Sequence, residues 1–530
     1  MAEVGVTTRR DFVAMLLGAP IAASVGCGSR TRQLPPGTIV GTGMQRAHHV
    51  VRDGGPVVPA SERRHRVVII GGGVAGLSAA WELRRHGVRD VVVLELDDVY
   101  GGTARGGAST VTTYPWGAHY IVAPQQEQVD LTALLSEMGA IEAVAADGTP
   151  IVDEALRCRE PEERVFYRGR WYEGLYLDAG ASPEDRAQLA AFRAQIDHWS
   201  AWRDGQGRRA FAIPRAGVSD DAEVRELDTL SFATWLDQRK LGSPRLRWLC
   251  EYACRDDYAL TTATTSAWAG LFYFAARQRG PGAPPQTVVT WPNGNGALVE
   301  HLAKGQAIER GVAVVEIDNT PEGVRIVAVA DRGAFAISAD AAIVATPTFV
   351  ANRIVAPRRG QAHGDYGAWT VANVHLHARP RAGRGAPAAW DNVFHDSASL
   401  GYVSATHQRG RDRGPTVWTW YYPFTDDDPS AVRKKLAGAG YAEWAEVVLA
   451  DLERAHPDIR DLVSNIEVAF WGHGMIRPRV GSMWSAELAA RSAPIGRVHF
   501  AHTDLSGLAL FEEAFDHGLR AGREVAGVLA

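Results

Sequence analysis

The sequence predicts an α/β fold in which a Rossmann-type domain, built on a parallel sheet, is interleaved with a second, α+β domain. The first observation is a run of four β-branched residues at 67–70, which is typical of a buried parallel strand and leads into a glycine-rich turn. The second is length, because 530 residues exceed one simple core and favour two intertwined domains. The third is a change from helical periodicity over 131–285 to strand patterns over 351–480.

The glycine-rich turn reads Gly-Gly-Gly-Val-Ala-Gly and satisfies the G-x-G-x-x-G pattern between a strand and an amphipathic helix. Gly71 permits a tight turn, Gly73 lets the backbone approach a pyrophosphate, and Gly76 lets the helix pack closely on the strand. The helix begins at Val74 and Ala75, where unpaired N–H groups and the positive end of the helix dipole would meet the phosphates. The turn therefore predicts a phosphate-binding site.

A second strand over 91–94 delivers Glu95 nineteen residues after Gly76. A carboxylate there can accept hydrogen bonds from an adenosine ribose, and its charge would repel a 2′-phosphate. Because strand, glycines, helix, strand and acid fall in register, we interpret this stretch as a dinucleotide-binding unit.

The segment Tyr-Gly-Gly-Thr-Ala-Arg at 100–105 resembles the G-G-R segment of FAD-containing amine oxidases and carotenoid-desaturase-like flavoproteins. In that family this turn touches the FAD pyrophosphate, which would give that role to Gly101, Gly102, Thr103 and Arg105. The arginine stands two residues later here than in the family. The stretch Pro-Trp-Gly-Ala-His-Tyr at 115–120 is also similar to the family's G-A-H-[WY] segment. The resemblance implies FAD rather than NAD, on a glutathione-reductase-like FAD domain.

The same resemblance, together with the composition of the chain, predicts the domain boundaries. Residues 63–130, 286–350 and 481–530 are expected to form the FAD-binding domain. Residues 131–285 and 351–480 are expected to form the substrate domain, as a helical cap plus a sheet.

Three further positions take cofactor roles by resemblance. Val314 stands on a strand whose backbone contacts adenine in relatives, and Asp504 follows the final strand, one step later than the acid that binds the ribityl–pyrophosphate region. Phe511 begins a helix whose N-terminus points at the flavin pyrimidine edge in relatives, where its dipole would stabilise negative charge on reduced flavin. His502 and Glu513 depart from the family pattern in this stretch, the second at a usual glycine position.

The first thirty residues are expected to be an export signal. Thr-Arg-Arg-Asp-Phe at 8–12 precedes an apolar run over 13–25 and resembles a twin-arginine (Tat) signal, which implies the Tat machinery as a partner and a periplasmic or otherwise exported protein. Cys27 could be a lipoprotein processing site, and cleavage without lipid is the alternative; a lipid there is the sole membrane contact expected. Residues 31–62 lack periodicity and are interpreted as a linker.

Charge and motif content exclude several functions. The formal net charge is −5 with no long basic block outside the N-terminus, which argues against nucleic acid as a partner. Cys250 and Cys254 are interpreted as buried small apolar residues rather than as a disulfide or metal site. The chain has a single dinucleotide motif, so electrons should come from the substrate and leave to O₂ or another, periplasmic, acceptor.

Candidate catalytic residues follow from the family comparison. Many amine oxidases of this family carry a lysine beside flavin N5, and our alignment places Asn373 there, which favours a dehydrogenase or a desaturase over an oxidase. His119 and His473 are candidates for a polar group near the flavin that titrates near neutrality, with a structural histidine as the alternative for each.

Two features bear on the substrate. Asp256 and Asp257 could bind a cation or could form a solvated turn or helix cap. The aromatic residues of the strand near 416–422 could line a cage over the flavin, or the strand could be packed on both faces; they are Trp418, Trp420, Tyr421 and Tyr422.

We therefore expect an exported FAD-dependent oxidoreductase that removes a hydride from a small amine, with polyamines as the most natural class. One alternative is a desaturase-like flavoprotein that acts on an apolar isoprenoid. The other is an exported flavin-binding protein without turnover.

Overall fold

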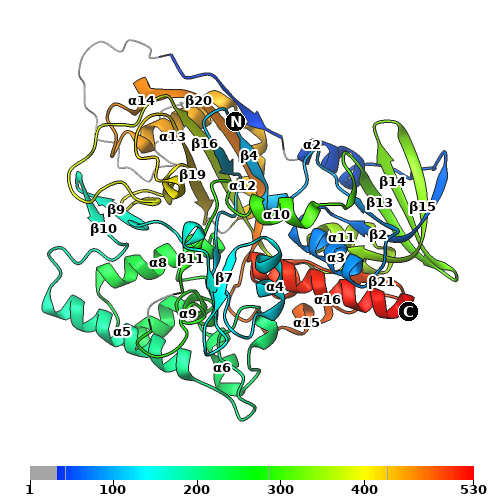
Figure 1. The fold of residues 1–530 in the computed structure, drawn as a ribbon, viewed down its shortest axis with the longest axis horizontal. Helices are drawn as coiled ribbons and strands as arrows, with labels where there is room; N and C mark the ends of the chain where they lie inside the picture. The colour runs from blue at the N-terminus through cyan, green and yellow to red at the C-terminus, as the bar shows by residue number, and fades with distance from the viewer. Residues whose placement is uncertain (1–32, 42, 284–285, 426–427) are drawn as a thin grey trace, which may run out of the picture.

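The computed structural model describes residues 33–41, 43–283, 286–425 and 428–530. The expected export signal, Cys27 included, lies outside the described residues. Figure 1 shows the Rossmann sheet with its helices on one side of the molecule, and the second sheet and the helical cap on the other. Within the described residues, no helix is both long and apolar enough to cross a membrane.

The Rossmann-type sheet has seven strands in the order β12-β3-β2-β15-β14-β13, with β21 paired to β15. Its strands are β2 (Glu62–Ile70), β3 (Val91–Leu94), β12 (Ala307–Glu309), β13 (Ala313–Thr320), β14 (Gly323–Ala330), β15 (Gly333–Val344) and β21 (Val498–Phe500). β2, β3, β12, β15 and β21 run parallel, and β13–β15 form an antiparallel meander. The predicted α/β class is confirmed, and one sheet draws on three distant stretches of the chain.

Three helices cover this sheet: α3 (Val74–Arg85), α10 (Gly296–Ala303) and α16 (Phe511–Leu529). The backbones at the glycine turn approach so closely that side chains are excluded. A Cβ on Gly76 would lie 1.9 Å from the carbonyl oxygen of Gly71, and a Cβ on Gly518 of α16 would lie 2.4 Å from that of Ala75 on α3. Glycine at these positions lets α3 pack tightly on both β2 and α16.

The second sheet has eight strands in the order β1-β20-β16-β19-β18-β17-β9-β10. They are β1 (Gly37–Val40), β9 (Glu163–Tyr167), β10 (Arg170–Glu173), β16 (Tyr366–Leu376), β17 (Asp391–Phe394), β18 (Gly401–Ser404), β19 (Thr416–Phe424) and β20 (Val463–Ile476). Alternate residues of β16 enter different apolar clusters, because a strand points successive side chains to opposite faces. One face packs on α12 (Pro429–Gly438), α13 (Tyr441–Leu452) and α14 (Ile459–Leu462).

The helical cap shares an apolar core of its own. It comprises α5 (Pro183–Ala201), α6 (Ala222–Glu226), α7 (Phe232–Gln238), α8 (Pro244–Tyr258) and α9 (Ala267–Ala275). Ser182 starts α5 with a capping box to Asp185. Cys250 and Cys254 of α8 are buried free thiols in that core, as their spacing predicted.

Smaller elements connect these units. They are β4 (Gly106–Ala108), β5 (Thr113–Pro115), β6 (Ile121–Val122), α4 (Val129–Glu137), β7 (Ile141–Val144), β8 (Pro150–Val152), β11 (Val288–Val289), α11 (Thr348–Ile354) and α15 (Ala486–Ala490). β4 pairs with β5, β6 with β11, and β7 with β8.

The stretch interpreted as a linker is structured where it is described, which corrects that expectation. β1 pairs in parallel with β20, from Gly37 opposite Ile466 to Val40 opposite Ala469. α2 (Met44–Arg46) and a following π-helical turn (Ala47–Arg52) then lie on the Rossmann domain. Four residues added to a strand edge gain their hydrogen bonds from the partner backbone, so side-chain periodicity gave no signal of them.

The α3–α16 contact yields a prediction. Gly518→Val places side-chain atoms where the Ala75 carbonyl stands, so overpacking should cost about 1–3 kcal/mol and lower the thermal midpoint. Gly527→Ala on the same helix is the matched control, because no described atom lies within 4 Å of its Cβ position. The control variant should leave the thermal midpoint unchanged or raise it. An unchanged midpoint for Gly518→Val would contradict the close helix contact.

Candidate functional site

One large cavity, of about 1500 Å³, connects the glycine turn of the Rossmann domain to the helical cap. Both domains line it: β2, α3, β3 and α16 on one side, and β16, β19, β20 and α8 on the other. Pockets for small ligands measure roughly 300–1,000 Å³. The cavity is therefore large enough for a dinucleotide and a further small molecule.

The glycine turn forms one end of the cavity. Gly71 has φ +106°, a conformation that L side chains rarely adopt. Gly73 lines the cavity, and no described atom lies within 4 Å of the place its Cβ would take. Val74 and Ala75, in the first turn of α3, line the cavity beside it, where their backbone N–H groups have no partner within the helix. Gly76 lies behind the turn and serves its packing.

Glu95 lines the same end of the cavity, at the carboxyl end of β3. Its Oε2 accepts the Gly72 N–H at 2.7 Å and its Oε1 accepts the Asp97 N–H at 2.8 Å. Burial raises the pKa of Glu95, and the two N–H donors oppose that effect. A carboxylate has about four acceptor sites, so this one can still receive ribose hydroxyls.

The second glycine turn lies directly beside the first, because the Gly101 N–H donates to the Gly72 carbonyl at 2.8 Å. Gly101 and Gly102 both have positive φ, +110° and +56°, and a Cβ on Gly102 would lie 3.6 Å from the Cα of Gly73. Gly101, Gly102 and Thr103 line the cavity. The two turns therefore form one main-chain-lined wall of the cavity, of the kind against which a diphosphate can bind.

Arg105 does not line the cavity, which corrects the expectation taken from the family. Its side chain is buried, pairs with Asp97 at 3.1 Å, and lies 5.0 Å over the ring of Trp471. It directly follows a 3₁₀ turn, Gly102–Ala104. Arg105 therefore braces the turn and does not reach the cavity.

Of the three other residues expected to contact the cofactor, two line the cavity and one does not. Val314 and Phe511 line the cavity, and Asp504 does not. The buried Asp504 Oδ2 accepts the Thr348 N–H at 2.7 Å and the Tyr366 hydroxyl, and His502 Nδ1 lies 3.0 Å from Oδ1.

Burial raises the pKa of Asp504, but His502 and the two donors outweigh it and bring the pKa to about 2. The side chains at the cavity are His502 and Thr503 instead. Asp504 therefore acts beside the cavity: its Oδ2 is occupied by two donors, and its main-chain N–H donates to His502 Nδ1 at 3.2 Å, which orients the imidazole.

Glu513, at the usual glycine position, turns away from the cavity. Its Oε1 accepts the Arg215 N–H at 2.6 Å, and burial raises its pKa to about 7. Arg215 stands two residues after Ile213, which lines the cavity from the cap. Glu513 thereby ties a cap loop to the first turn of α16, whose neighbouring Glu512 faces the cavity.

His119 and His473 both line the cavity, and neither titrates near neutrality. Burial lowers the pKa of each to about 4, and for His473 the nearby Arg433 lowers it further. The His119 Nδ1 lies 3.2 Å from the Gly117 carbonyl oxygen. A carbonyl only accepts, so Nδ1 carries the hydrogen and Nε2 is left with a free lone pair.

Asn373 lies outside the cavity, contrary to the expectation. It is fully buried, its Nδ2 donates to the Pro115 carbonyl at 3.2 Å, and its Oδ1 accepts the Thr419 hydroxyl at 2.8 Å. The segment ending in β5 covers this part of β16. The residues that β16 presents to the cavity are Trp369 and Val371.

Asp256 and Asp257 lie at the cap end of the cavity, in the last turn of α8, and are not a solvated turn. Asp257 accepts two hydrogen bonds from Arg277 Nη2, at 3.0 and 3.2 Å. Burial raises the pKa of Asp256, and the adjacent Asp257 raises it further. Glu163 also raises it, while Arg277 and Arg255 oppose the shift.

Two more carboxyls enlarge this acidic region. Burial raises the pKa of Glu163 to about 7 and that of Asp391 well above its usual range. Asp391 accepts a hydrogen bond from the Tyr252 hydroxyl at 3.3 Å. Carboxyls therefore outnumber guanidinium groups around Asp256.

The prediction that four aromatic residues of β19 line a cage over the flavin is wrong for three of them. Trp418, Trp420 and Tyr422 belong to the core between the sheet and α13, while Tyr421 lines the cavity. Strand alternation separates them. Trp369 and Trp471, which line the cavity from neighbouring strands, were missed in the sequence, although their period-two spacing from other cavity residues could have indicated them.

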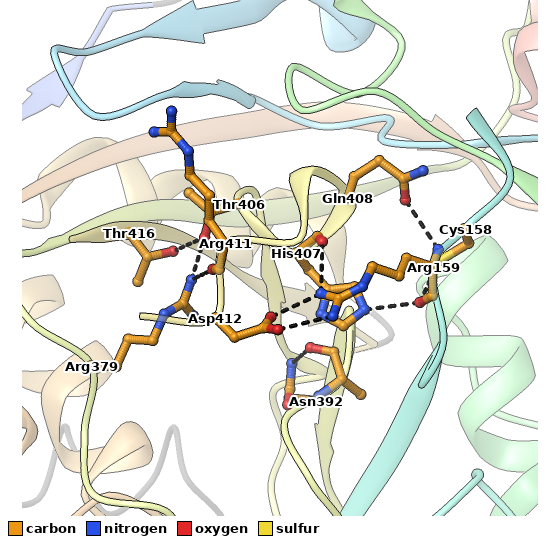
Figure 2. A network of polar contacts seen from close by, with 11 residues as sticks. Cys158, Arg159, Arg379, Asn392, Thr406, His407, Gln408, Arg411, Asp412 and Thr416 are labelled. Carbon is orange, nitrogen blue, oxygen red and sulfur yellow. Dashed lines mark hydrogen bonds and ion pairs between the residues drawn. The ribbon is translucent and has the colours of Figure 1, made fainter. Parts of the chain in front are cut away.

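A second polar network lies outside the cavity (Figure 2). Arg159 pairs with Asp412 at 2.9 Å, its carbonyl faces His407 Nε2 at 2.8 Å, and its N–H donates to Gln408 Oε1 at 3.1 Å. The Cys158 thiol also points at the Arg159 carbonyl, and burial raises its pKa. The network joins the β18–β19 loop to the chain that enters β9 and offers no thiolate–imidazole pair.

The lining fits FAD. The adjoining glycine turns leave open space at Gly73 for a diphosphate, α3 aims its N-terminus there, and Glu95 stands where a ribose would lie. The Oγ1 of Thr346 and the Oδ1 of Asn295, both on lining residues, are buried with no hydrogen-bond partner among the described residues. In that same part of the chain, no group of three or more His, Cys, Asp or Glu residues is arranged to hold a metal ion.

Comparison with known proteins agrees with this geometry. A family model described as flavin containing amine oxidoreductase matches residues 74–526. An L-amino acid dehydrogenase of Synechocystis is 23% identical over 499 residues, which cover 87% of this chain and 95% of that protein.

Solved amine oxidases share the fold. A putrescine oxidase bound to putrescine superposes with a TM-score of 0.62 at 17% identity, over 88% of this chain and 100% of the other. Cyclohexylamine oxidase from Brevibacterium oxydans superposes with a TM-score of 0.58 at 17% identity, over 87% and 98%.

The open space at Gly73 yields a prediction. Gly73→Val should fold as the wild type, because its side chain enters the cavity and meets no described atom within 4 Å at Cβ. Its affinity for FAD should fall at least tenfold, because the valine side chain would occupy the space that the diphosphate needs. Apoprotein thermal melts and FAD binding by calorimetry measure the two effects. Wild-type FAD affinity in the folded variant would contradict the assignment.

Proposed function

The chain belongs to the flavin containing amine oxidoreductase family and is an FAD-dependent oxidoreductase, and we propose that it removes a hydride from a small amine. Bound FAD supplies a two-electron acceptor for a C–H bond next to nitrogen. The protein's part is to hold the amine beside the cofactor, exclude water and orient the reacting bond.

The observation that carries this proposal is the unbalanced charge around Asp256. Arg277 is paired with Asp257, and no ion pair joins Asp256 to a cation among the described residues. A buried carboxyl in that position is held partly protonated by burial and by like charge. A bound ammonium would supply the missing positive charge and favour the ionised carboxylate.

A polyamine suits this site better than a monoamine. Glu163 and Asp391 lie outside the cavity lining but couple electrostatically to Asp256, so their negative potential would also favour a second ammonium of the same substrate. Trp369 and Tyr421 offer apolar walls for the methylene chain between the charges. The putrescine oxidase of similar fold is consistent with this class.

Arg277 supports a second candidate, an amino acid. Its guanidinium lines the cavity and could receive an α-carboxylate while Asp256 receives the ammonium. The L-amino acid dehydrogenase relative is consistent with this alternative. Asp257 already neutralises Arg277, which makes the simple amine the leading proposal.

His119 would position the substrate and would not act as a base for it, because burial lowers the pKa of its imidazole to about 4. Nε2 is free to accept a hydrogen bond, because Nδ1–H is directed at the Gly117 carbonyl. The Tyr421 hydroxyl donates to the same carbonyl at 2.9 Å, and the two rings lie 4.9 Å apart between centroids. This arrangement fixes the orientation of the imidazole at the cavity wall.

The amine proposal is tested by anaerobic flavin bleaching. Putrescine, spermidine, a monoamine and L-amino acids are added in turn to the holoprotein, and polyamines should bleach it at the lowest concentrations. Admission of O₂, or of a quinone, then shows which acceptor restores the colour. Bleaching by apolar isoprenoids alone, or by nothing in the panel, would contradict the proposal and favour a desaturase-like or a non-catalytic protein.

Asp256→Asn should raise the dissociation constant for the amine about tenfold or more, because a charge-assisted hydrogen bond is lost, worth roughly 1.5–3 kcal/mol. Glu322→Gln, an exposed acid in a β-turn, is the control for loss of one charge. The raised pKa of Asp256 adds a pH dependence. Wild-type affinity should increase as pH rises and ionises Asp256, until the amine itself loses its proton; in Asp256→Asn this increase should be lost. An unaltered pH profile in the variant would contradict the role of Asp256.

We also propose that the chain is exported by the Tat route, which rests on the twin arginines at 9 and 10 and the apolar run that follows. Cell fractionation tests it. The wild type should reach the periplasmic or membrane fraction, and the variant with Arg9→Lys and Arg10→Lys should stay in the cytoplasm. Arg30→Lys, beyond the apolar run, is the control. Equal export of all three proteins would contradict the Tat assignment.

A further inference from the structure

We propose that residues 44–57 form a strap that closes the adenosine end of the FAD site and makes the protein depend on the adenosine half of its cofactor. This strap comprises α2, the π-helical turn and the Gly-Gly-Pro stretch that leads to β2. It precedes the part of the chain that the family model matches, which begins at residue 74. The proposal rests on the FAD cofactor and is independent of the substrate class.

The strap is a wall of the cavity itself. Residues 47–57 contribute lining positions that include Ala47, Val50, Val51 and Pro56. The same cavity is lined by Glu95, which marks the ribose end of the site.

The strap begins at the ribose end. The Arg46 guanidinium donates to the Leu96 carbonyl at 2.8 Å and lies 3.3 Å from Asp98. A Cβ on Gly43, just before the strap, would lie 2.5 Å from Asp97 Oδ1. The chain therefore enters the strap in contact with the residues that directly follow Glu95.

The strap then crosses β13 and is held on its far side by α11. Arg353 Nε donates to the Val51 carbonyl at 2.9 Å, and its Nη2 donates to the Arg52 carbonyl. Val51 packs against the apolar cluster that contains Val312 and Val314. An adenosine against β13 would lie in a space that the strap also borders.

The upstream chain is anchored to the other domain. β1 pairs with β20, and the Tyr441 hydroxyl donates to the Pro35 carbonyl at 2.7 Å. The strap is thus fixed on both sides, by the substrate sheet before it and by β2 after it. A segment with both ends fixed loses little further entropy when it closes on a ligand.

Two consequences follow for the cofactor. FAD should leave slowly, because its adenosine half is enclosed until the strap lifts. A flavin that lacks this half should bind without any benefit from the strap. These consequences separate a strap that contacts the cofactor from a segment that merely stabilises the fold.

The experiment compares three ligands on apoprotein: FAD, ADP for the adenosine half, and riboflavin for the flavin half. Arg353→Gln removes both hydrogen bonds to the strap and should weaken FAD and ADP about tenfold each, with riboflavin unchanged. Arg46→Gln, which frees the start of the strap, should act in the same direction. Arg332→Gln, an exposed arginine in the β14–β15 turn, is the matched control.

Tryptic cleavage after Arg52 gives an independent readout on the wild-type chain. FAD and ADP should slow this cleavage, and riboflavin should not. Wild-type affinity for ADP in both arginine variants, or equal loss of all three ligands, would overturn the proposal. So would cleavage at Arg52 that ADP leaves unchanged. None of these outcomes depends on turnover, so failure here is distinct from failure of the amine assay.

Discussion

The close approach of backbones around α3 is the constraint on which the rest of the structure depends. Gly76 admits the Gly71 carbonyl at a distance no side chain would allow, and Gly518 does the same for α16 against Ala75. The first contact aims the N-terminus of α3 into the cavity. The second brings α16 alongside, so that Phe511 and its neighbours, 437 residues after Val74, line the same cavity. Two packing contacts of α3 thus position two helix N-termini at one cavity.

The electrostatics of the cavity change along its length. At the Rossmann end, each carboxylate oxygen of Glu95 accepts one main-chain N–H, which fixes the orientation of the carboxylate. At the cap end, burial raises the pKa of Asp256, and the neighbouring Asp257 and Glu163 raise it further. Between them, His119 and His473 are neutral at physiological pH because burial lowers their pKa. The amine proposed above would therefore meet neutral histidine walls before it reached the acidic end.

Local patterns in the sequence were sufficient to predict the glycine turn, α3 and Glu95, because strand, turn and helix are consecutive and their spacing carries the geometry. The roles of Arg105 and Asn373 could not be predicted, because each is decided by a distant segment. Asp97 and Trp471 hold the first, and the Pro115 carbonyl covers the second. The strap carried no periodicity because the bonds that hold it come from partners such as Arg353.

The most direct measurement is the cofactor content of the purified chain, determined from its visible absorption and from the flavin released on denaturation. If the adjoining glycine turns and Glu95 hold a dinucleotide, the protein is yellow and contains one FAD per chain, or takes up one when FAD is added to the apoprotein. A colourless protein that stays folded and binds no added FAD would contradict this reading of the cavity.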